Sequence, residues 1–233
     1  MQRLIPWLAA LLTMALFVRL GFWQLDREQE KRALFDGFST ALTQPPRLLD
    51  PYTPQPRFSR VELEGQFTGI QFLLDNQVFE GSPGVHVYAP FNLTSVKQTV
   101  LVNRGWLPME RTRRTLPDLP TLPFGNTRVQ GHLSSYPQPG IKVGQPDYET
   151  PQPWLLIYME PDTLAEALGL PLAPQVMLET SPEPTSFTQQ WAPKVMAPEK
   201  HRGYAVQWFS LAVAVLIVTL ILALKKDPKT STP

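Results

Sequence analysis

Two long apolar stretches near the ends of the sequence constrain the fold more than any other feature. Residues 4–25 form a stretch of 22 residues with one charged side chain, Arg19, and residues 204–224 form a stretch of 21 residues with none. At about 1.5 Å per helical residue, each stretch spans roughly 30 Å, which is the thickness of the hydrocarbon core of a bilayer. The sequence therefore predicts one transmembrane helix at residues 1–25 and a second at residues 204–224.

The alternative for the first stretch is a cleaved signal peptide. Its apolar run is longer than the usual core of a signal peptide, and the sequence GFWQLDRE at its end lacks the small residues of a cleavage site. Arg19 also lies near enough to the outer end for its guanidinium to reach the interface. These observations favour a retained anchor.

Charge predicts the orientation of this two-helix arrangement. A basic tail, residues 225–233, follows the second span, and Arg3 precedes the first, so the positive-inside rule favours two cytoplasmic termini. Basic residues within 27–32 oppose this assignment, but long loops cross the membrane largely regardless of charge. Because the first span starts almost at residue 1, we expect a bacterial inner membrane rather than an organelle, with residues 26–203 in the periplasm.

The composition of residues 26–203 excludes several classes of function. Their formal net charge is −3 and no basic stripe is present, so we expect no nucleic-acid partner. The chain has no cysteine, which rules out disulfides and thiolate metal sites. There is no G-x-S-x-G elbow and no phosphate-binding loop. We therefore expect no enzymatic activity. A membrane-anchored enzyme with a proline-rich lid is the hypothesis for this protein that these residues support least.

The region between the spans is predicted to be an α+β domain. Residues 26–43 are rich in helix-forming residues and extend the first helix until Pro45 and Pro46 end it. From residue 57 the pattern changes to a period of two, and residues 57–180 contain six or seven short strands and one short helix, PDTLAEALGL. We expect a mainly antiparallel barrel or half-barrel, followed by a proline-rich return at residues 181–203.

The stretch LVNRGWLP, residues 101–108, is the most unusual one outside the predicted membrane spans. A short apolar strand runs into Asn103, Arg104, Gly105 and Trp106 before it stops at a proline. Arginine and tryptophan can offer a flat cationic and aromatic surface to a partner. The alternative is a structural bulge, in which Trp106 caps the core and Arg104 pairs with a carboxylate. Asn103, Arg104 and Trp106 are candidate partner-binding residues.

A cluster of polar and aromatic residues stands at the start of the second span. On a helix, His201, Tyr204 and Trp208 are spaced i, i+3 and i+7 and so share one face. The first span ends in GFWQL, so an antiparallel hairpin would place Trp23 and Gln24 at the same depth as Gln207 and Trp208 and bring two Trp–Gln pairs face to face.

Two interpretations of this cluster remain open from the residues alone. An aromatic belt at the membrane interface accounts for Trp23, Tyr204 and Trp208. It accounts less well for two glutamines at the edge of the hydrocarbon or for a histidine on the same stripe. A neutral imidazole above an aromatic wall suits an axial ligand for haem iron, which makes His201 a candidate ligand.

Three motifs together resemble the Surfeit locus protein family of cytochrome c oxidase assembly factors. They are LGFWQLDREQEK at the end of the first span, LVNRGWLP in the middle and HRGYAVQWFSLA at the start of the second span. The stretch GSPGVHVYAPFNL also fits the segment that such proteins carry ahead of the Asn-Arg-Gly-Trp motif. The resemblance covers essentially the whole chain, because the motifs follow in order between two anchors.

The resemblance implies a non-enzymatic factor that receives haem a from haem a synthase and helps to insert it into oxidase subunit I. His201 is then the proposed iron ligand, and the other candidate haem-site residues are Tyr204, Gln207, Trp208, Trp23 and Gln24. Membrane lipid is a further expected partner. The alternative is a scaffold that stabilises an assembly intermediate of subunit I without binding haem.

Overall fold

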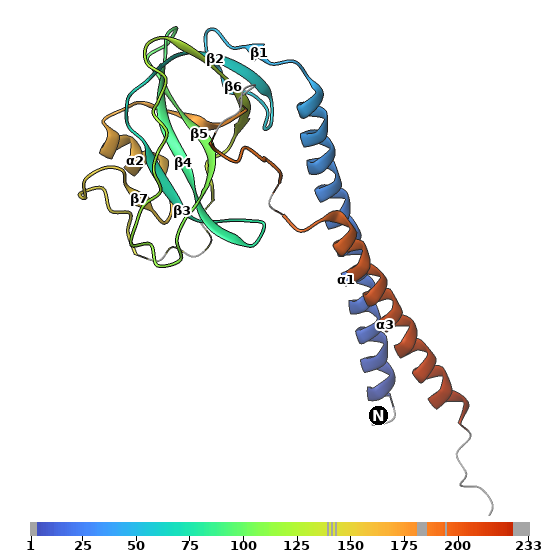
Figure 1. Ribbon diagram of the computed structural model, residues 1–233. Coiled ribbons are helices and arrows are strands. Elements are labelled where there is room, and N and C mark those ends of the chain that lie inside the picture. Colours follow the sequence, from blue (N-terminus) through green and yellow to red (C-terminus); the bar gives the residue numbers. More distant parts are fainter. Residues whose placement is uncertain are drawn as a thin grey trace, which may run out of the picture. The chain divides into compact units, whose positions relative to one another are not determined.

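The computed structural model describes residues 4–138, 140, 142, 144–180, 186–193 and 195–225. The predicted tail at 225–233 therefore lies outside the described residues, apart from Lys225. The chain divides into two compact units, a helical pair within Met1–Phe38 and Pro193–Pro233 and a β-rich unit, Ser39–Ala192 (Figure 1).

The first helix, α1 (Ile5–Thr43), runs without a break from the apolar stretch through its polar continuation. It ends just before the paired prolines, as the sequence predicts, because proline lacks the amide hydrogen that a further turn needs. The second long helix, α3 (Pro198–Leu224), starts earlier than the predicted residue 204. Proline is favoured at the first helical position, where no amide donor is required, so His201 lies in the first turn of α3.

Both long helices have the properties of membrane spans. In their most apolar windows only 6% of α1 and 11% of α3 is buried, so neither resembles the core helix of a soluble domain. The length and composition of both helices suit a bilayer, and the protein is therefore membrane-anchored. This confirms the prediction of two flanking apolar helices.

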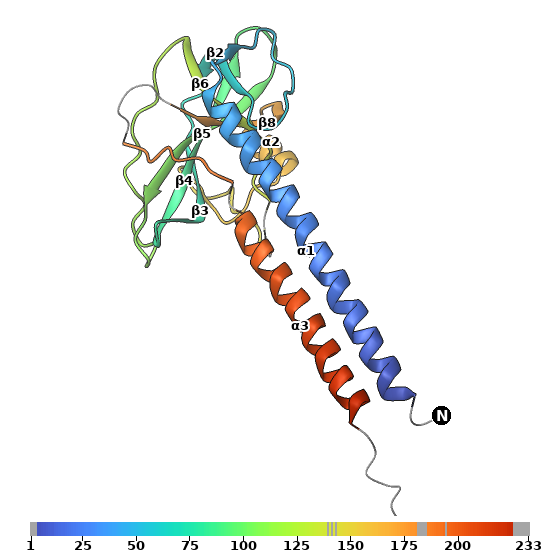
Figure 2. The same ribbon diagram turned by 90° about the vertical axis from the view of Figure 1, so that its right-hand side faces the viewer.

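The two helices run side by side in opposite directions (Figure 2). They contact each other along a seam of small and aromatic residues. Gly21, Ala205 and Ala212 are buried in this seam. A Cβ atom on Gly21 would lie 2.6 Å from a ring carbon of Phe209, so only glycine permits this close approach. The aromatic ring of Trp208 packs against Phe17, with 5.6 Å between ring centroids. These contacts fix how far one helix is shifted along the other.

In its described residues, the β-rich unit has eight strands and one short helix, α2 (Pro161–Leu168), which ends at Gly169 in the left-handed conformation. The strands are β1 (Arg47–Leu48), β2 (Arg60–Phe67), β3 (Phe72–Phe79), β4 (Ser82–Leu93), β5 (Thr99–Pro108), β6 (Thr127–Ser134), β7 (Leu155–Leu156) and β8 (Leu172–Glu179).

Five of these strands close into a barrel in the order β2–β6–β8–β5–β4 and back to β2. Closure depends on the length of β4, whose first part pairs with β3 and whose last part, around Phe91, pairs with β2. The two-stranded extension of β3 and β7 continues from β4, and β1 lies beside the start of β2. The predicted barrel is thus confirmed, and closure removes the free edges that a half-barrel would expose.

The sheet is mixed rather than purely antiparallel. Strand β8 lies antiparallel to β6 and parallel to β5, where Leu101 is opposite Val176. The apolar run PWLLIYME, residues 153–160, has the composition of a strand but contributes only the two residues of β7. Its partner strand β3 changes register between Leu74 and Gln77, so the pairing ends there.

The core fills the barrel and covers part of its outer surface. Inside, alternate residues of the strands pack together, as the period of two requires, and include Leu63, Phe91 and Met177. On the outside, α2 and the preceding segment place Leu164 and Trp154 over Phe72 and its neighbours.

Candidate functional site

The candidate haem ligand, His201, forms a well-defined hydrogen bond with the other long helix, α1. Its Nδ1 atom lies 2.8 Å from Oε1 of Gln24 in α1. An amide oxygen can only accept, so this contact is a hydrogen bond in the tautomer that carries its proton on Nδ1, which leaves a lone pair on Nε2. Among the described residues, Nε2 is buried and has no hydrogen-bond partner. A buried, unpaired nitrogen is rare because it loses its hydration without compensation.

The structure brings some of the predicted site residues together and separates others. Gln24 meets His201 rather than Gln207, and Trp208 packs on Phe17 rather than on Trp23. The predicted face-to-face arrangement of two Trp–Gln pairs is therefore wrong. The prediction places Trp23 and Gln24 at the same depth in the membrane as Gln207 and Trp208. The close contact at Gly21 instead shifts one helix along the other.

The exposed members of the cluster point away from the seam. Tyr204 is 45% exposed and Trp23 is 47% exposed, and Gln207 is also exposed. Ala205, next to Tyr204, takes the buried position in the seam. The guanidinium of Arg27 lies over the Trp23 ring, 5.8 Å from its centroid. The role of these exposed residues in a haem site stays a prediction.

A buried carboxylate, which the sequence analysis did not single out, lies one turn along α1 from Gln24. Glu28 is only 7% exposed; its Oε1 accepts a hydrogen bond from Arg32 at 2.6 Å and lies 4.0 Å from Nε of Arg202 in α3. The i, i+4 spacing of Gln24, Glu28 and Arg32 was the available signal, since such residues share one helical face. The seam between the helices therefore holds two polar contacts, Gln24–His201 and the Glu28 cluster.

The Asn-Arg-Gly-Trp motif lies in β5 of the β-rich unit, and its side chains are buried. Nη1 of Arg104 donates to Oε1 of Gln71 at 2.9 Å and to the carbonyl of Pro120 at 3.1 Å, and its Nε lies 3.8 Å from Glu179. Its guanidinium also stacks over Phe187, 4.7 Å from the ring centroid. Burial raises the pKa of the Glu179 carboxyl, and the charge of Arg104 opposes that shift.

The same motif holds the segment that returns toward α3. The backbone amide and carbonyl of Trp106 exchange two 2.9 Å hydrogen bonds with Thr188, and Gln189 donates to the carbonyl of Arg104 at 2.9 Å. Asn103 accepts the amide hydrogen of Gly105 at 3.1 Å, which stabilises the bend. These contacts agree with the structural interpretation of the motif, in which Trp106 is buried and Arg104 pairs with a carboxylate. Direct binding of a partner by Asn103, Arg104 and Trp106 stays a prediction.

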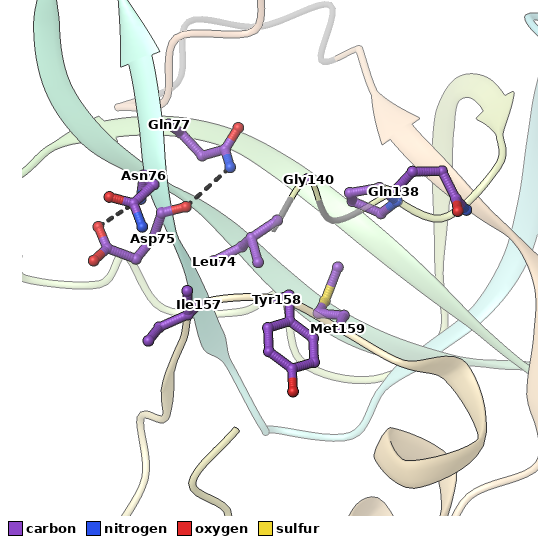
Figure 3. A pocket seen from close by; sticks show the side chains of 10 residues that line it. Leu74, Asp75, Asn76, Gln77, Gln138, Gly140, Ile157, Tyr158 and Met159 are labelled. Atoms are coloured by element: carbon purple, nitrogen blue, oxygen red, sulfur yellow. Dashed lines mark hydrogen bonds between the residues drawn. The ribbon is translucent and has the colours of Figure 1, made fainter. Parts of the chain in front are cut away.

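A separate pocket of about 240 Å³ opens in the β-rich unit beside β3 (Figure 3). Asp75 at its edge accepts the amide hydrogen of Asn76 at 2.6 Å and pairs with Arg113, while Tyr158 donates to the carbonyl of Gly144 at 3.0 Å. These polar groups bond within the domain rather than toward a ligand. In the part of the chain that the structure describes, no group of three or more His, Asp or Glu side chains could hold a metal ion.

Comparison with known proteins identifies the family. A sequence model described as the SURF1 family matches residues 11–213, which include both polar contacts of the helical seam and the β5 motif. A SURF1-like protein of Monosiga brevicollis is 25% identical over 228 residues, covering 88% of this chain and 83% of that protein. A SURF1-like protein of Rickettsia felis is 30% identical over 102 residues, covering 42% of this chain and 45% of that protein. Surfeit locus protein 1 of Takifugu rubripes is 29% identical over 114 residues, covering 40% and 47% of the two chains. The chain therefore belongs to the SURF1 family.

Proposed function

We propose that this protein is a membrane-anchored assembly factor of cytochrome c oxidase that holds haem a through His201 and passes it to oxidase subunit I. Family membership supports the role in oxidase assembly. The finer assignment rests on one observation, the buried and unpaired Nε2 atom of His201 in the seam between the two apolar helices. On this proposal haem a synthase supplies the haem, and the protein itself catalyses no reaction.

The residues present fit a haem ligand set. A neutral imidazole is a common axial ligand of haem iron, and the hydrogen bond from Nδ1 to Gln24 leaves Nε2 as the donor atom. The bound haem would supply a Lewis-acidic iron for this nitrogen. A single protein ligand suits a carrier, because one bond to iron can be broken again when the haem moves on. The exposed rings of Trp23 and Tyr204 lie on apolar helices, where a flat hydrophobic molecule can be held.

The proposed arrangement in the cell follows from the two spans. Both termini would lie in the cytoplasm and the β-rich unit in the periplasm of a bacterial inner membrane, with lipid around the exposed apolar faces of α1 and α3. The histidine at the start of α3 would then lie near the periplasmic interface.

One observation favours a second candidate, a scaffold for a subunit I intermediate that binds no haem. Nε2 of His201 is covered by the protein's own atoms, so iron could reach it only after the imidazole or a helix moves. On this alternative the unpaired nitrogen would be a cost of helix packing.

Haem content separates the two candidates. The full-length protein and its His201→Ala variant are purified from a host that makes haem a, and extracted haem is measured beside the absorption spectrum. We expect a Soret band and haem a in the wild-type protein and neither in the variant. A colourless wild-type protein that still co-purifies with oxidase subunits would contradict haem binding and favour the scaffold.

A further inference from the structure

We infer that Gln24 is a positioning residue that sets the tautomer of His201, so that Nε2 and not Nδ1 holds the lone pair that can bind a metal. The effect of this tautomer on haem binding rests on the proposed function. The structural content of the inference, the proton on Nδ1, holds independently of any ligand.

The first argument is the geometry of the hydrogen bond. The 2.8 Å separation between Nδ1 of His201 and Oε1 of Gln24 is that of a well-formed hydrogen bond. The amide oxygen has no hydrogen, so the bond forms only when Nδ1 is protonated. A neutral imidazole free in water prefers to carry its proton on Nε2, and the contact with Gln24 therefore reverses the intrinsic preference of the ring.

The second argument is that Gln24 has little freedom to move. It lies one turn from Gly21, which contacts the Phe209 ring so closely that no Cβ would fit. The contact between the tilted rings of Phe17 and Trp208 lies on the other side of that glycine. These contacts fix the shift of α1 along α3 and hold the Gln24 amide opposite the first turn of α3. Rotation of the imidazole to satisfy Nε2 would break the bond at Nδ1.

The third argument concerns the charge of the partner. A carboxylate at this position would draw the Nδ1 proton more strongly and make Nε2 a more basic ligand, which stabilises oxidised iron. The buried carboxylate one turn along α1, Glu28, is instead paired with Arg32 and lies 4.0 Å from Arg202. A neutral amide orients the ring without adding charge, as suits a ligand that must later release its metal.

The tautomer can be measured without haem. The full-length protein, labelled with ¹⁵N-histidine, is examined by NMR in lipid nanodiscs at a pH where imidazole is neutral, and His201→Ala assigns its signals among the three histidines of the chain. We expect the Nδ1–H tautomer in the wild-type protein and a shift toward Nε2–H in Gln24→Leu. Gln29→Leu, at an exposed position of the same helix, is the matched control and should leave the spectrum unchanged. An Nε2–H tautomer in the wild-type protein, or no change in Gln24→Leu, would overturn the inference.

The consequence for haem is tested by titrating haem a into the same variants. We expect Gln24→Leu to bind about 10–100-fold more weakly, the usual cost of removing the partner of a ligating histidine. Gln24→Glu should restore affinity and lower the midpoint potential, because a carboxylate accepts the same hydrogen bond. If Gln24→Leu bound haem as tightly as the wild-type protein and Gln24→Glu did not, Gln24 would have only a packing role and the inference would be wrong. Failure of the wild-type protein to bind haem would instead contradict the proposed function, and the NMR result would still decide the tautomer.

Discussion

Arg104 and Gly105 occupy adjacent positions of β5 but are needed for different physical reasons. Arg104 supplies hydrogen bonds and an aromatic stack to segments that are distant in sequence. Gly105 supplies a backbone conformation, φ 134°, that other residues rarely adopt, and it leaves room for the returning segment. A Cβ atom at this position would lie 2.6 Å from Cβ of Phe187. The motif therefore combines one residue chosen for its side chain with one chosen for the lack of it.

Gly105→Ala should destabilise the β-rich unit by about 2–4 kcal/mol, because it adds backbone strain to a steric overlap. Gly125→Ala is the matched control: Gly125 also has a positive φ, 81°, but no atom lies within 4 Å of the added Cβ. It should cost only about 1–2 kcal/mol. Urea unfolding of the full-length protein in detergent, followed by tryptophan fluorescence, measures both values. Equal losses in the two variants would show that the overlap of the added Cβ with Phe187 costs no stability.

The buried His132 predicts how stability depends on pH. Burial lowers the pKa of His132; the hydrogen bond to the carbonyl of Phe58 opposes this shift, and the charge of Arg60 adds to it. As the pH falls below the ordinary value of 6.5, the unfolded chain takes up a proton that the folded chain does not. The free energy of unfolding should therefore fall by about 1.4 kcal/mol per pH unit until the lowered pKa is reached.

The contribution of His132 is isolated by comparison with His132→Asn. Other groups, such as Glu179, titrate in both proteins, so they cancel in the difference between the two unfolding curves. The variant should be less stable at neutral pH but lose less stability on acidification. Parallel curves would mean that His132 is as easily protonated in the folded chain as in the unfolded one.

At the scale of elements, the helical pair depends on one close approach. Gly21 contacts the Phe209 ring directly, and the polar contacts of Gln24 and Glu28 follow at successive turns of the same face. Without a strong hydrophobic drive between helices in lipid, such packing and the polar contacts determine how two spans associate.

Gly21→Leu should separate the two helices by roughly 2–3 Å near the substitution, because a leucine side chain replaces a backbone contact. Gly37→Leu is the control in the same helix, since a Cβ atom there meets no atom within 4 Å. Spin labels at the exposed positions Leu8 and Leu220 report the separation by pulsed electron paramagnetic resonance. A longer, broader distance distribution is expected for Gly21→Leu alone; an unchanged distribution would contradict the role assigned to the seam.

The sequence predicted the helices better than it predicted their contacts. Apolar length and the prolines after α1 are local signals, and they gave the helical extension to residue 43 correctly. The helical period placed His201 and Trp208 on one face, but only the contact at Gly21 determines which residues of α1 they meet. In the β-rich unit, alternation predicted a barrel, but the placement of β8 between β5 and β6 joins strands far apart in sequence, and alternation carries no information about such pairing.

At the scale of the whole molecule, the proposed orientation predicts that the β-rich unit is accessible to a reagent outside the membrane and that the two ends of the chain are not. Because the chain has no cysteine, each single-cysteine variant carries one reactive thiol. Phe124→Cys, at a residue that is 100% exposed, should react with a membrane-impermeant maleimide added to intact spheroplasts. Leu4→Cys and Lys225→Cys should react only after the membrane is opened. The reverse pattern would place the β-rich unit in the cytoplasm.

The position of β8 has a consequence for the order of events during synthesis. It is the last strand of the barrel in sequence, yet it lies between β5 and β6, and α3 begins soon after it, at Pro198. The barrel therefore stays open along one side until almost the whole unit has been translated. We expect the second anchor to follow within seconds, at the usual rate of about 5–20 residues per second. We therefore expect the domain to close and the second span to insert at nearly the same time. Until then, α1 is the anchor that holds the nascent chain in the membrane.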